Sequence, residues 1–362
     1  MNSRVLETVK SFAYLGVIFS SGGRFRDCAE DKLKKSNFAA FKIRSIFENI
    51  GLTSSFSRSL LYESSVLSVL LYGSEVWGLE VGDILEKAQV RFFKNLYFLD
   101  KSTPGYVVRL EFSIDSVEIP IVSRAINWLC KLLDMDESRY PKICYRRLLY
   151  LDSIGICYQN WVSTMRAFFE RAGQIGLFHS QSASLIRGSK EIILNALRLS
   201  FSRIDYDRAV KSSYCPVYGH LLGHDNWVLG APMALSRARL LFQLRVQNTR
   251  SQTFYWKGRV QRFLPSRFCQ LCSLQAPDSF THLVLSCPNL TRGRLRFLPL
   301  LSDRHTESEK MAIILSTREN LGMLLEFVEW AFSFRVSPDP RLESSDHHAQ
   351  LPIQFSFVFQ FI

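Results

Sequence analysis

Residues 27–51 read DCAEDKLKKSNFAAFKIRSIFENIG, and this stretch decides the fold class of the chain. Its apolar side chains recur at intervals of three and four residues, with Ser36 filling the remaining place: Ala29, Leu33, Ala40, Ile43 and Phe47. That spacing places them on one face of an α-helix. Gly51 stands where the helix should end, and Asp27 is a candidate for its N-terminal cap. The pattern predicts a long amphipathic helix.

Helical spacing continues along the chain, whereas a strand is expected before it. Further helices are predicted over residues 57–71, 84–96, 125–133 and 141–149. The apolar run from Phe12 to Phe19 enters the polar stretch Ser20 to Gly23, which is typical of a strand followed by a turn. The sequence therefore predicts a mainly α fold with a short N-terminal β-hairpin.

The composition favours a folded protein with a polyanionic partner. Of the 362 residues, 47% are hydrophobic, which is enough to bury a substantial core. Lys and Arg number 45 against 33 Asp and Glu, so the net charge is +12. Such a charge favours polyanionic partners or acidic membrane surfaces, although solubility alone is an equally simple explanation.

The sequence predicts an intracellular protein, nuclear or cytoplasmic, that is not secreted and has no membrane partner. Met1 to Lys10 lacks the apolar region of a signal peptide. No apolar run reaches the roughly 20 residues that a membrane span needs. The eight cysteines are too dispersed for the disulfide scaffold of a small secreted domain, so reduced thiols are expected.

Three of these cysteines cluster with a histidine near the C-terminus. Their spacing is C-x2-C-x9-H-x4-C, formed by Cys269, Cys272, His282 and Cys287. Three thiolates and one imidazole are a donor set that suits tetrahedral Zn²⁺. We expect Asp278 or Ser279 to cap a short helix that carries His282. Because all four positions are filled, the predicted zinc is structural; the alternative is three incidental cysteines and a polar histidine.

A basic segment overlaps this cluster. Residues 226–277 contain no Asp or Glu. Cations and aromatic residues alternate there in a way that suits phosphates and stacked single-stranded bases. The predicted nucleic-acid-binding residues are Arg237, Arg239, Arg245, Arg250, Tyr255, Trp256, Lys257, Arg259, Arg262 and Arg267. Alternatively, the aromatic residues, Phe254 among them, close a small core around the zinc site while the charges are only solvated.

Catalytic patterns are weak by comparison. Polymerases hold two metal ions with paired carboxylates, yet the chain has no adjacent Asp-Asp pair. Asp205 and Asp207 lack a flanking strand and turn, and Asp225 beside His224 is more typical of a polar loop. The sequence therefore predicts that this chain is not itself an enzyme.

Three motifs, in this order, resemble the C-terminal portion of non-LTR (LINE-type) retrotransposon reverse transcriptases. They are FAYLGVIFSSGG at 12–23, VLLYGSEVW at 69–77 and the Cys-Cys-His-Cys cluster. The stretch from Phe92 to Glu111 is similar to the segment after the second motif in that family. The resemblance covers roughly residues 5–335, but no motif matches between 120 and 230.

The resemblance implies a domain order and a role for each part. It implies a primer-grip-like hairpin (1–24) with Tyr14, Leu15 and Gly16 holding the primer end, then a thumb-like helical region (25–119). A helical linker region (120–230), a basic region with a zinc knuckle (231–335) and a tail expected to be disordered (336–362) come next. The family's aromatic-x-Asp-Asp motif lies upstream of Tyr14, where only thirteen residues precede, so we expect a truncated product without a polymerase centre.

Two alternatives stay open. The chain is either part of an active RNA-directed DNA polymerase encoded in a longer product, or a helical scaffold whose zinc only stabilises the C-terminal fold. The sequence does not distinguish RNA from DNA as the preferred partner.

Overall fold

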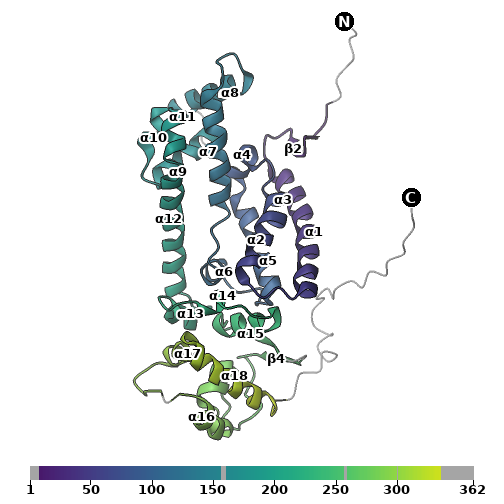
Figure 1. Ribbon diagram of the computed structural model, residues 1–362, viewed down its shortest axis with the longest axis vertical. Coiled ribbons are helices and arrows are strands. Elements are labelled where there is room, and N and C mark those ends of the chain that lie inside the picture. Colours follow the sequence, from purple (N-terminus) through teal and green to yellow (C-terminus); the bar gives the residue numbers. More distant parts are fainter. Residues whose placement is uncertain (1–7, 156–159, 257–258, 300, 336–362) are drawn as a thin grey trace, which may run out of the picture.

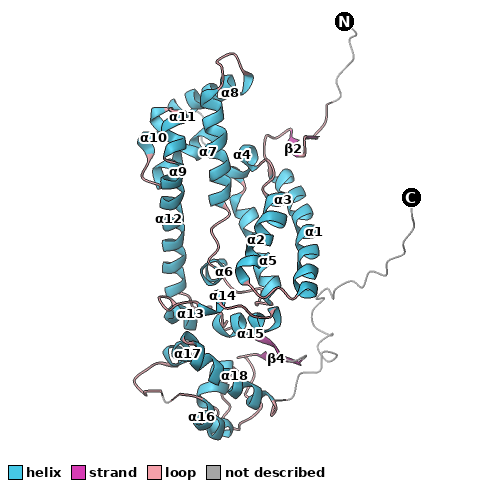
Figure 2. Cartoon of the chain, viewed as in Figure 1, coloured by secondary structure: helices cyan, strands magenta, loops and turns pink. Residues whose placement is uncertain are grey.

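The computed structural model describes residues 8–155, 160–256, 259–299 and 301–335. Within these ranges the chain is mainly helical, with eighteen α-helices and two short antiparallel hairpins, which confirms the predicted class (Figures 1 and 2). No helix in the described ranges has the length and apolar character needed to cross a bilayer. The predicted tail, 336–362, lies outside the described residues.

The N-terminal hairpin forms as expected, but its turn lies elsewhere. Strands β1 (Ser11–Tyr14) and β2 (Val17–Ser20) are antiparallel, with Phe12 opposite Phe19. The chain reverses at Leu15 and Gly16, whose φ angles are 46° and 79°. Two consecutive positive φ angles are typical of a tight hairpin turn. The run at 12–19, expected as one strand, is thus split between two strands. The turn expected at 20–23 does form after β2, where the N–H of Gly23 donates to the carbonyl of Ser20 at 3.0 Å.

The first helical bundle follows the hairpin. Helix α1 is the long helix that the opening stretch predicts, and it ends with Gly51 in the left-handed conformation, at φ 65°. Asp27 is not the cap, because the helix begins one residue earlier and no side chain caps it. The second predicted helix is interrupted by a π-helical turn, Glu63–Leu67. The helices of this bundle are α1 (Arg26–Ile50), α2 (Ser55–Tyr62), α3 (Ser68–Leu70), α4 (Ser74–Trp77), α5 (Gly82–Tyr97) and α6 (Gly105–Phe112).

The middle of the chain, where no motif was found, forms a second group of helices. Its core joins α7, α9 and α12 around Leu129, Phe169 and Leu197. Helix α12 runs along the molecule and connects this group with the opposite end (Figure 1). The helices of this group are α7 (Glu118–Asp134), α8 (Tyr140–Ser153), α9 (Trp161–Arg171), α10 (Ile175–Ser180), α11 (Ala183–Gly188) and α12 (Lys190–Val210). Two short helices after α12 pack into the largest hydrophobic core instead: α13 (Pro216–Leu221) and α14 (Trp227–Gly230).

The C-terminal part contains a second hairpin that the sequence pattern did not predict. Strands β3 (Gln252–Trp256) and β4 (Arg259–Phe263) are antiparallel, and Phe254 and Phe263 pack together with Phe280 beneath them. The surrounding helices are α15 (Leu235–Arg245), α16 (Thr291–Phe297), α17 (Glu307–Ser316) and α18 (Arg318–Phe332).

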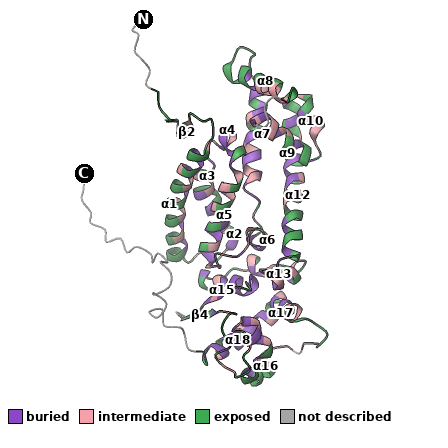
Figure 3. Ribbon diagram, turned by 180° about the vertical axis from the view of Figure 1, so that it is seen from behind, coloured by how far each residue is buried: buried purple, intermediate pink, exposed green. Residues whose placement is uncertain are grey.

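The largest hydrophobic core joins the first bundle to the C-terminal part. Phe242 on α15 lies 4.8 Å from Tyr97 and 4.7 Å from Phe112, measured between ring centroids. The buried guanidinium of Arg58 donates to the carbonyl oxygens of Leu52 and Met233, the latter at 2.8 Å. Figure 3 shows these inward faces as buried, whereas the outer face of α1 is exposed. The C-terminal part is therefore held against α5 and α6.

Candidate metal centre and basic surface

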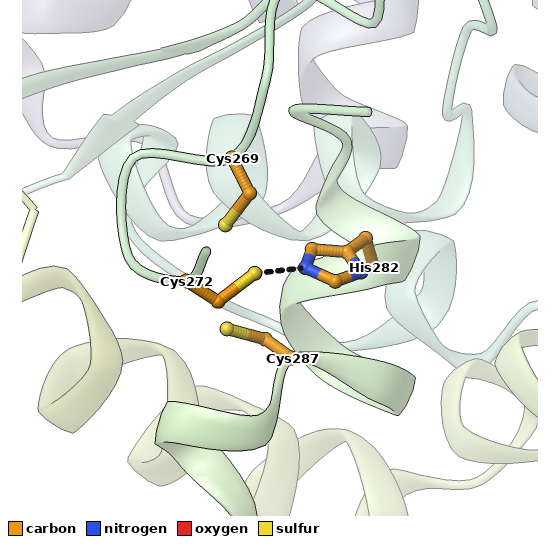
Figure 4. Close-up of side chains that lie close together, drawn as sticks. All are labelled: Cys269, Cys272, His282 and Cys287. Atoms are coloured by element: carbon orange, nitrogen blue, oxygen red, sulfur yellow. Dashed lines mark hydrogen bonds between the residues drawn. The ribbon is translucent and has the colours of Figure 1, made fainter. Parts of the chain in front are cut away.

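Cys269 and Cys272 lie on a small closed loop that follows β4. The backbone N–H of Cys269 donates to the carbonyl of Ala276 at 2.8 Å, and Phe268 pairs with Pro277. The N–H of Leu271 donates to the Cys269 sulfur at 3.4 Å, which keeps the turn between the two cysteines tight. Both thiols are thereby brought to the same side of the loop (Figure 4).

His282 and Cys287 come from the next element, a π-helical turn spanning His282–Ser286. Ser279 accepts a hydrogen bond from the N–H of His282 at 3.0 Å, so Ser279 supports the start of this turn. Asp278, the other predicted cap, instead pairs with Arg335 at 2.6 Å. The Nδ1 atom of His282 lies 3.1 Å from the Ser286 hydroxyl, which leaves Nε2 directed at the cysteines.

The four side chains converge as the spacing predicts. Their sulfur and imidazole atoms all lie within 4.8 Å of one another, and Nε2 of His282 is 3.4 Å from the Cys272 sulfur (Figure 4). Cys269, His282 and Cys287 are buried, and Cys272 is half-buried. Four soft donors at these separations fit a closed tetrahedral shell. The cluster can therefore hold a metal ion.

The electrostatics of the cluster favour the neutral forms of Cys287 and His282. Burial raises the pKa of the Cys287 thiol to about 11, and the charges of Cys269 and Cys272 contribute to that rise. Burial also lowers the pKa of His282, so its imidazole is neutral, as a metal ligand must be. A divalent ion would replace the thiol protons and remove the repulsion between neighbouring thiolates.

Five of the ten predicted nucleic-acid-binding residues have exposed side chains. They are Arg237, Arg250, Tyr255, Arg262 and Arg267. The guanidinium of Arg250 lies over the Tyr214 ring, 4.6 Å from its centroid, and donates to its hydroxyl at 3.0 Å. Trp256 and Arg259 pair across the β3–β4 hairpin, and Lys257 lies outside the described residues.

Two predicted residues point inward instead. Arg245 is only 2% exposed and pairs with Glu111 at 2.6 Å, so the prediction that it binds nucleic acid was wrong. Arg239 is half-buried, stacks on Phe98 at 3.9 Å and pairs with Glu48 at 2.8 Å. Both acids come from helices remote in sequence. Phe254 is buried among other phenylalanines, which agrees with the core alternative for that residue.

Of the three residues predicted to hold a primer, Tyr14 ends β1, and Leu15 and Gly16 form the turn of the N-terminal hairpin. The side chains of Tyr14 and Leu15 are exposed, and the carbonyl of Gly16 accepts a hydrogen bond from Lys32 at 2.6 Å. The Lys32 ammonium also lies over the Tyr72 ring, 4.8 Å from its centroid. This hairpin and the metal cluster do not meet, because they lie toward opposite ends of the molecule (Figure 1).

Three arginines beside the cluster were missed in the sequence. Helix α16 begins four residues after Cys287 and carries Arg292, Arg294 and Arg296. Burial lowers the pKa of Arg294, and its Nη1 atom is buried without a partner among the described residues. Gly293 lets α16 approach α18, because a Cβ there would meet the Trp330 ring at 2.1 Å. The alternating arginines in TRGRLRF, 291–297, were the signal that could have revealed them.

Asp205, one of the carboxylates singled out in the sequence, has a structural partner. Asp205 accepts two hydrogen bonds from Arg109, both at 2.6 Å, and Arg109 also pairs with Glu86 at 2.8 Å. Asp205 is thus committed to an ion-pair network between α6 and α12.

Comparisons with models of known protein families, with curated proteins and with solved structures give no significant match to this chain.

Proposed function

We propose that this chain is a zinc-stabilised, single-stranded nucleic-acid-binding protein derived from the C-terminal portion of a LINE-type reverse transcriptase. The observation that carries the proposal is the convergence of Cys269, Cys272, His282 and Cys287 beside an acid-free basic segment. The three ordered sequence motifs support the family origin. In this proposal the chain does not join nucleotides itself, because its sequence holds no Asp-Asp pair for polymerase metals.

Zinc is the metal that the donor set favours. Zn²⁺ binds thiolate and imidazole ligands well, whereas Mg²⁺ and Ca²⁺ take oxygen ligands. With three thiolates and a neutral imidazole the shell is complete, which is typical of a structural rather than a catalytic ion. The ion would tie the Cys269 loop to the turn that carries His282 and Cys287, and would thereby support the neighbouring hairpin.

Single-stranded nucleic acid is the partner that the exposed side chains favour. Arg237, Arg250 and Arg267 are exposed cations suited to phosphate, and Tyr255 offers a ring of which 43% is exposed. Bases of a single strand are free to stack on such a ring, whereas bases in a duplex are not. The arginines of α16 extend the positive surface beside the metal cluster.

The metal is tested by elemental analysis of the purified protein. We expect about one zinc per chain in the native protein and a loss of that zinc in Cys272→Ser. Cys144→Ser is the matched control, because Cys144 is an exposed cysteine on α8 outside the cluster. A native protein that is correctly folded and free of zinc would overturn this part of the proposal.

Binding is tested with a labelled single-stranded oligonucleotide. We expect the triple variant Arg237→Gln, Arg250→Gln, Arg267→Gln to bind at least tenfold more weakly than the native protein. The control removes three exposed arginines elsewhere: Arg139→Gln, Arg147→Gln and Arg203→Gln. Equal loss in both variants, or no binding by the native protein, would instead favour a helical scaffold.

A further inference from the structure

A wide groove opens beside helix α5, and none of its lining residues belongs to the metal cluster or to the second hairpin. Its volume is about 690 Å³, and it is bounded by α5, the loop after it and the first turn of α6. The residues that matter to its chemistry are Lys87, Arg91, Lys94, Lys101, Arg109 and Glu86. None of them lies in the basic segment that the sequence singled out.

The lining of this groove carries a net positive charge, because it holds five cationic side chains and one carboxylate, that of Glu86. Lys87, Arg91 and Lys94 lie four and three residues apart on α5, which places them along one face of the helix. Lys101 faces the groove from the following loop. Within the described ranges, none of these four side chains has an ion-pair partner. Arg109, by contrast, is neutralised by Glu86 at 2.8 Å and Asp205 at 2.6 Å.

Three features of the groove favour an anion. The Lys94 ammonium donates to the carbonyl of Lys101 at 2.9 Å, which ties the loop to the helix. Burial lowers the pKa of Lys94, and the charge of Asp100 opposes this shift only in part, so the partly desolvated ammonium gains from a further anion. Gly105, the first residue of α6, also lines the groove, and the N–H groups of a first helical turn have no partner within the helix.

We propose that this groove binds phosphate groups through Lys87, Arg91, Lys94 and Lys101. The ligand chemistry is a chain of phosphates, supplied either by a free polyphosphate or by the backbone of a nucleic acid. Lys87 and Lys94 are seven residues apart on α5, so they are separated by about 10 Å along the helix axis. A row of cations of this length suits a chain of phosphates better than a single phosphate. This site is separate from the metal centre and does not depend on the function proposed above.

The test uses tripolyphosphate in isothermal titration calorimetry and, separately, a twelve-nucleotide single strand. We expect the double variant Lys87→Gln/Arg91→Gln to bind at least one of these ligands tenfold or more weakly than the native protein. The control, Lys131→Gln/Arg203→Gln, removes the same charge from exposed positions outside the groove and should bind like the native protein. Far-UV circular dichroism and melting temperatures show that both variants fold.

The outcomes separate the two phosphate sources. Loss of tripolyphosphate binding in the groove variant alone supports a site for free polyphosphate, whereas loss confined to the oligonucleotide supports a backbone site. Equal weakening in groove and control variants, or no binding of either ligand by the native protein, would overturn the proposal. Because the triple variant Arg237→Gln, Arg250→Gln, Arg267→Gln leaves the groove intact, failure here is distinguishable from failure of the proposed function.

Discussion

Arg245 and Glu111 meet in the interior although 134 residues separate them in the chain. Both side chains are almost fully enclosed, and Arg245 also donates to the carbonyl of Leu315. Burial alone would disfavour both charges, but their pairing and the shared hydrogen bonds compensate for the lost water. Arg245 therefore joins α15 to α6 and α17, and its charge stays within the protein.

The pair predicts a large effect on stability. Arg245→Met should lower the free energy of unfolding by about 3–5 kcal/mol, because the Glu111 carboxylate is left buried without a partner. Urea denaturation measures the change, and Arg237→Met, at an exposed position of the same helix, is the control. A loss below about 1 kcal/mol would contradict the ion pair as described.

Asp100 predicts a dependence of stability on pH. Burial would raise the pKa of this carboxyl, but hydrogen bonds from Ser102 and Ser251 outweigh it, and the pKa is lowered. The unfolded chain therefore takes up the proton first as the pH falls. The stabilisation is complete above the unfolded pKa, about 3.9, and is lost as the pH falls through the folded value.

The corresponding experiment compares Asp100→Asn with the native protein. The variant should be less stable at pH 7, and the difference should shrink as the pH is lowered toward 3. Urea midpoints at both pH values test this. A difference that is the same at the two pH values would show that the Asp100 charge is not responsible.

Among the elements, local periodicity predicted the helices better than it predicted the hairpins. Helix α1 follows from its apolar spacing and from Gly51, which is its left-handed C-cap. The β3–β4 hairpin was missed because aromatic residues between cations resemble a binding surface as much as a strand. What makes it a strand pair is the core beneath it, where Phe254 meets Phe280 and Phe332. Those partners are not local in sequence.

Substitutions of the neighbouring β3 residues Phe254 and Tyr255 should differ in their effects on stability and on single-strand binding. Phe254→Ala should cost about 3–5 kcal/mol of stability, because it removes a ring from a packed core. Tyr255→Ala should cost less, about 0.5–1.5 kcal/mol, because only the contact with Phe98 at 5.0 Å between ring centroids is lost. The same change should weaken single-strand binding by about 1–3 kcal/mol, the value of one stacked base. Thermal melts and oligonucleotide titrations of both variants test the assignment. It fails if Tyr255→Ala binds as tightly as the native protein.

At the scale of the whole molecule, the metal cluster was predictable and the basic surface only partly. The four ligands lie within nineteen residues, so their spacing carries the geometry. Whether each arginine is exposed or paired depends instead on acidic residues from distant helices, such as Glu48 beside Arg239 and Glu111 beside Arg245. An acid-free segment in the sequence is therefore not an acid-free environment in the fold.

Removal of the proposed zinc ion should affect more than the cluster itself. Cys269 and Cys287 belong to the same hydrophobic core as Phe112 and Phe242. Chelation should therefore lower the melting temperature of the main helical transition, followed by far-UV circular dichroism, and restoring zinc should reverse it. An unchanged main transition in the metal-free protein would show that the cluster is energetically isolated.

The central claim is that exposed arginines bind the phosphates of a single strand. Its most direct test is the salt dependence of oligonucleotide affinity, because each phosphate contact contributes about −0.7 to the slope of log affinity against log salt. The account predicts a steep negative slope for the native protein and a slope about 2 units shallower for Arg237→Gln, Arg250→Gln, Arg267→Gln. Binding that is absent, or unaffected by salt, would contradict it.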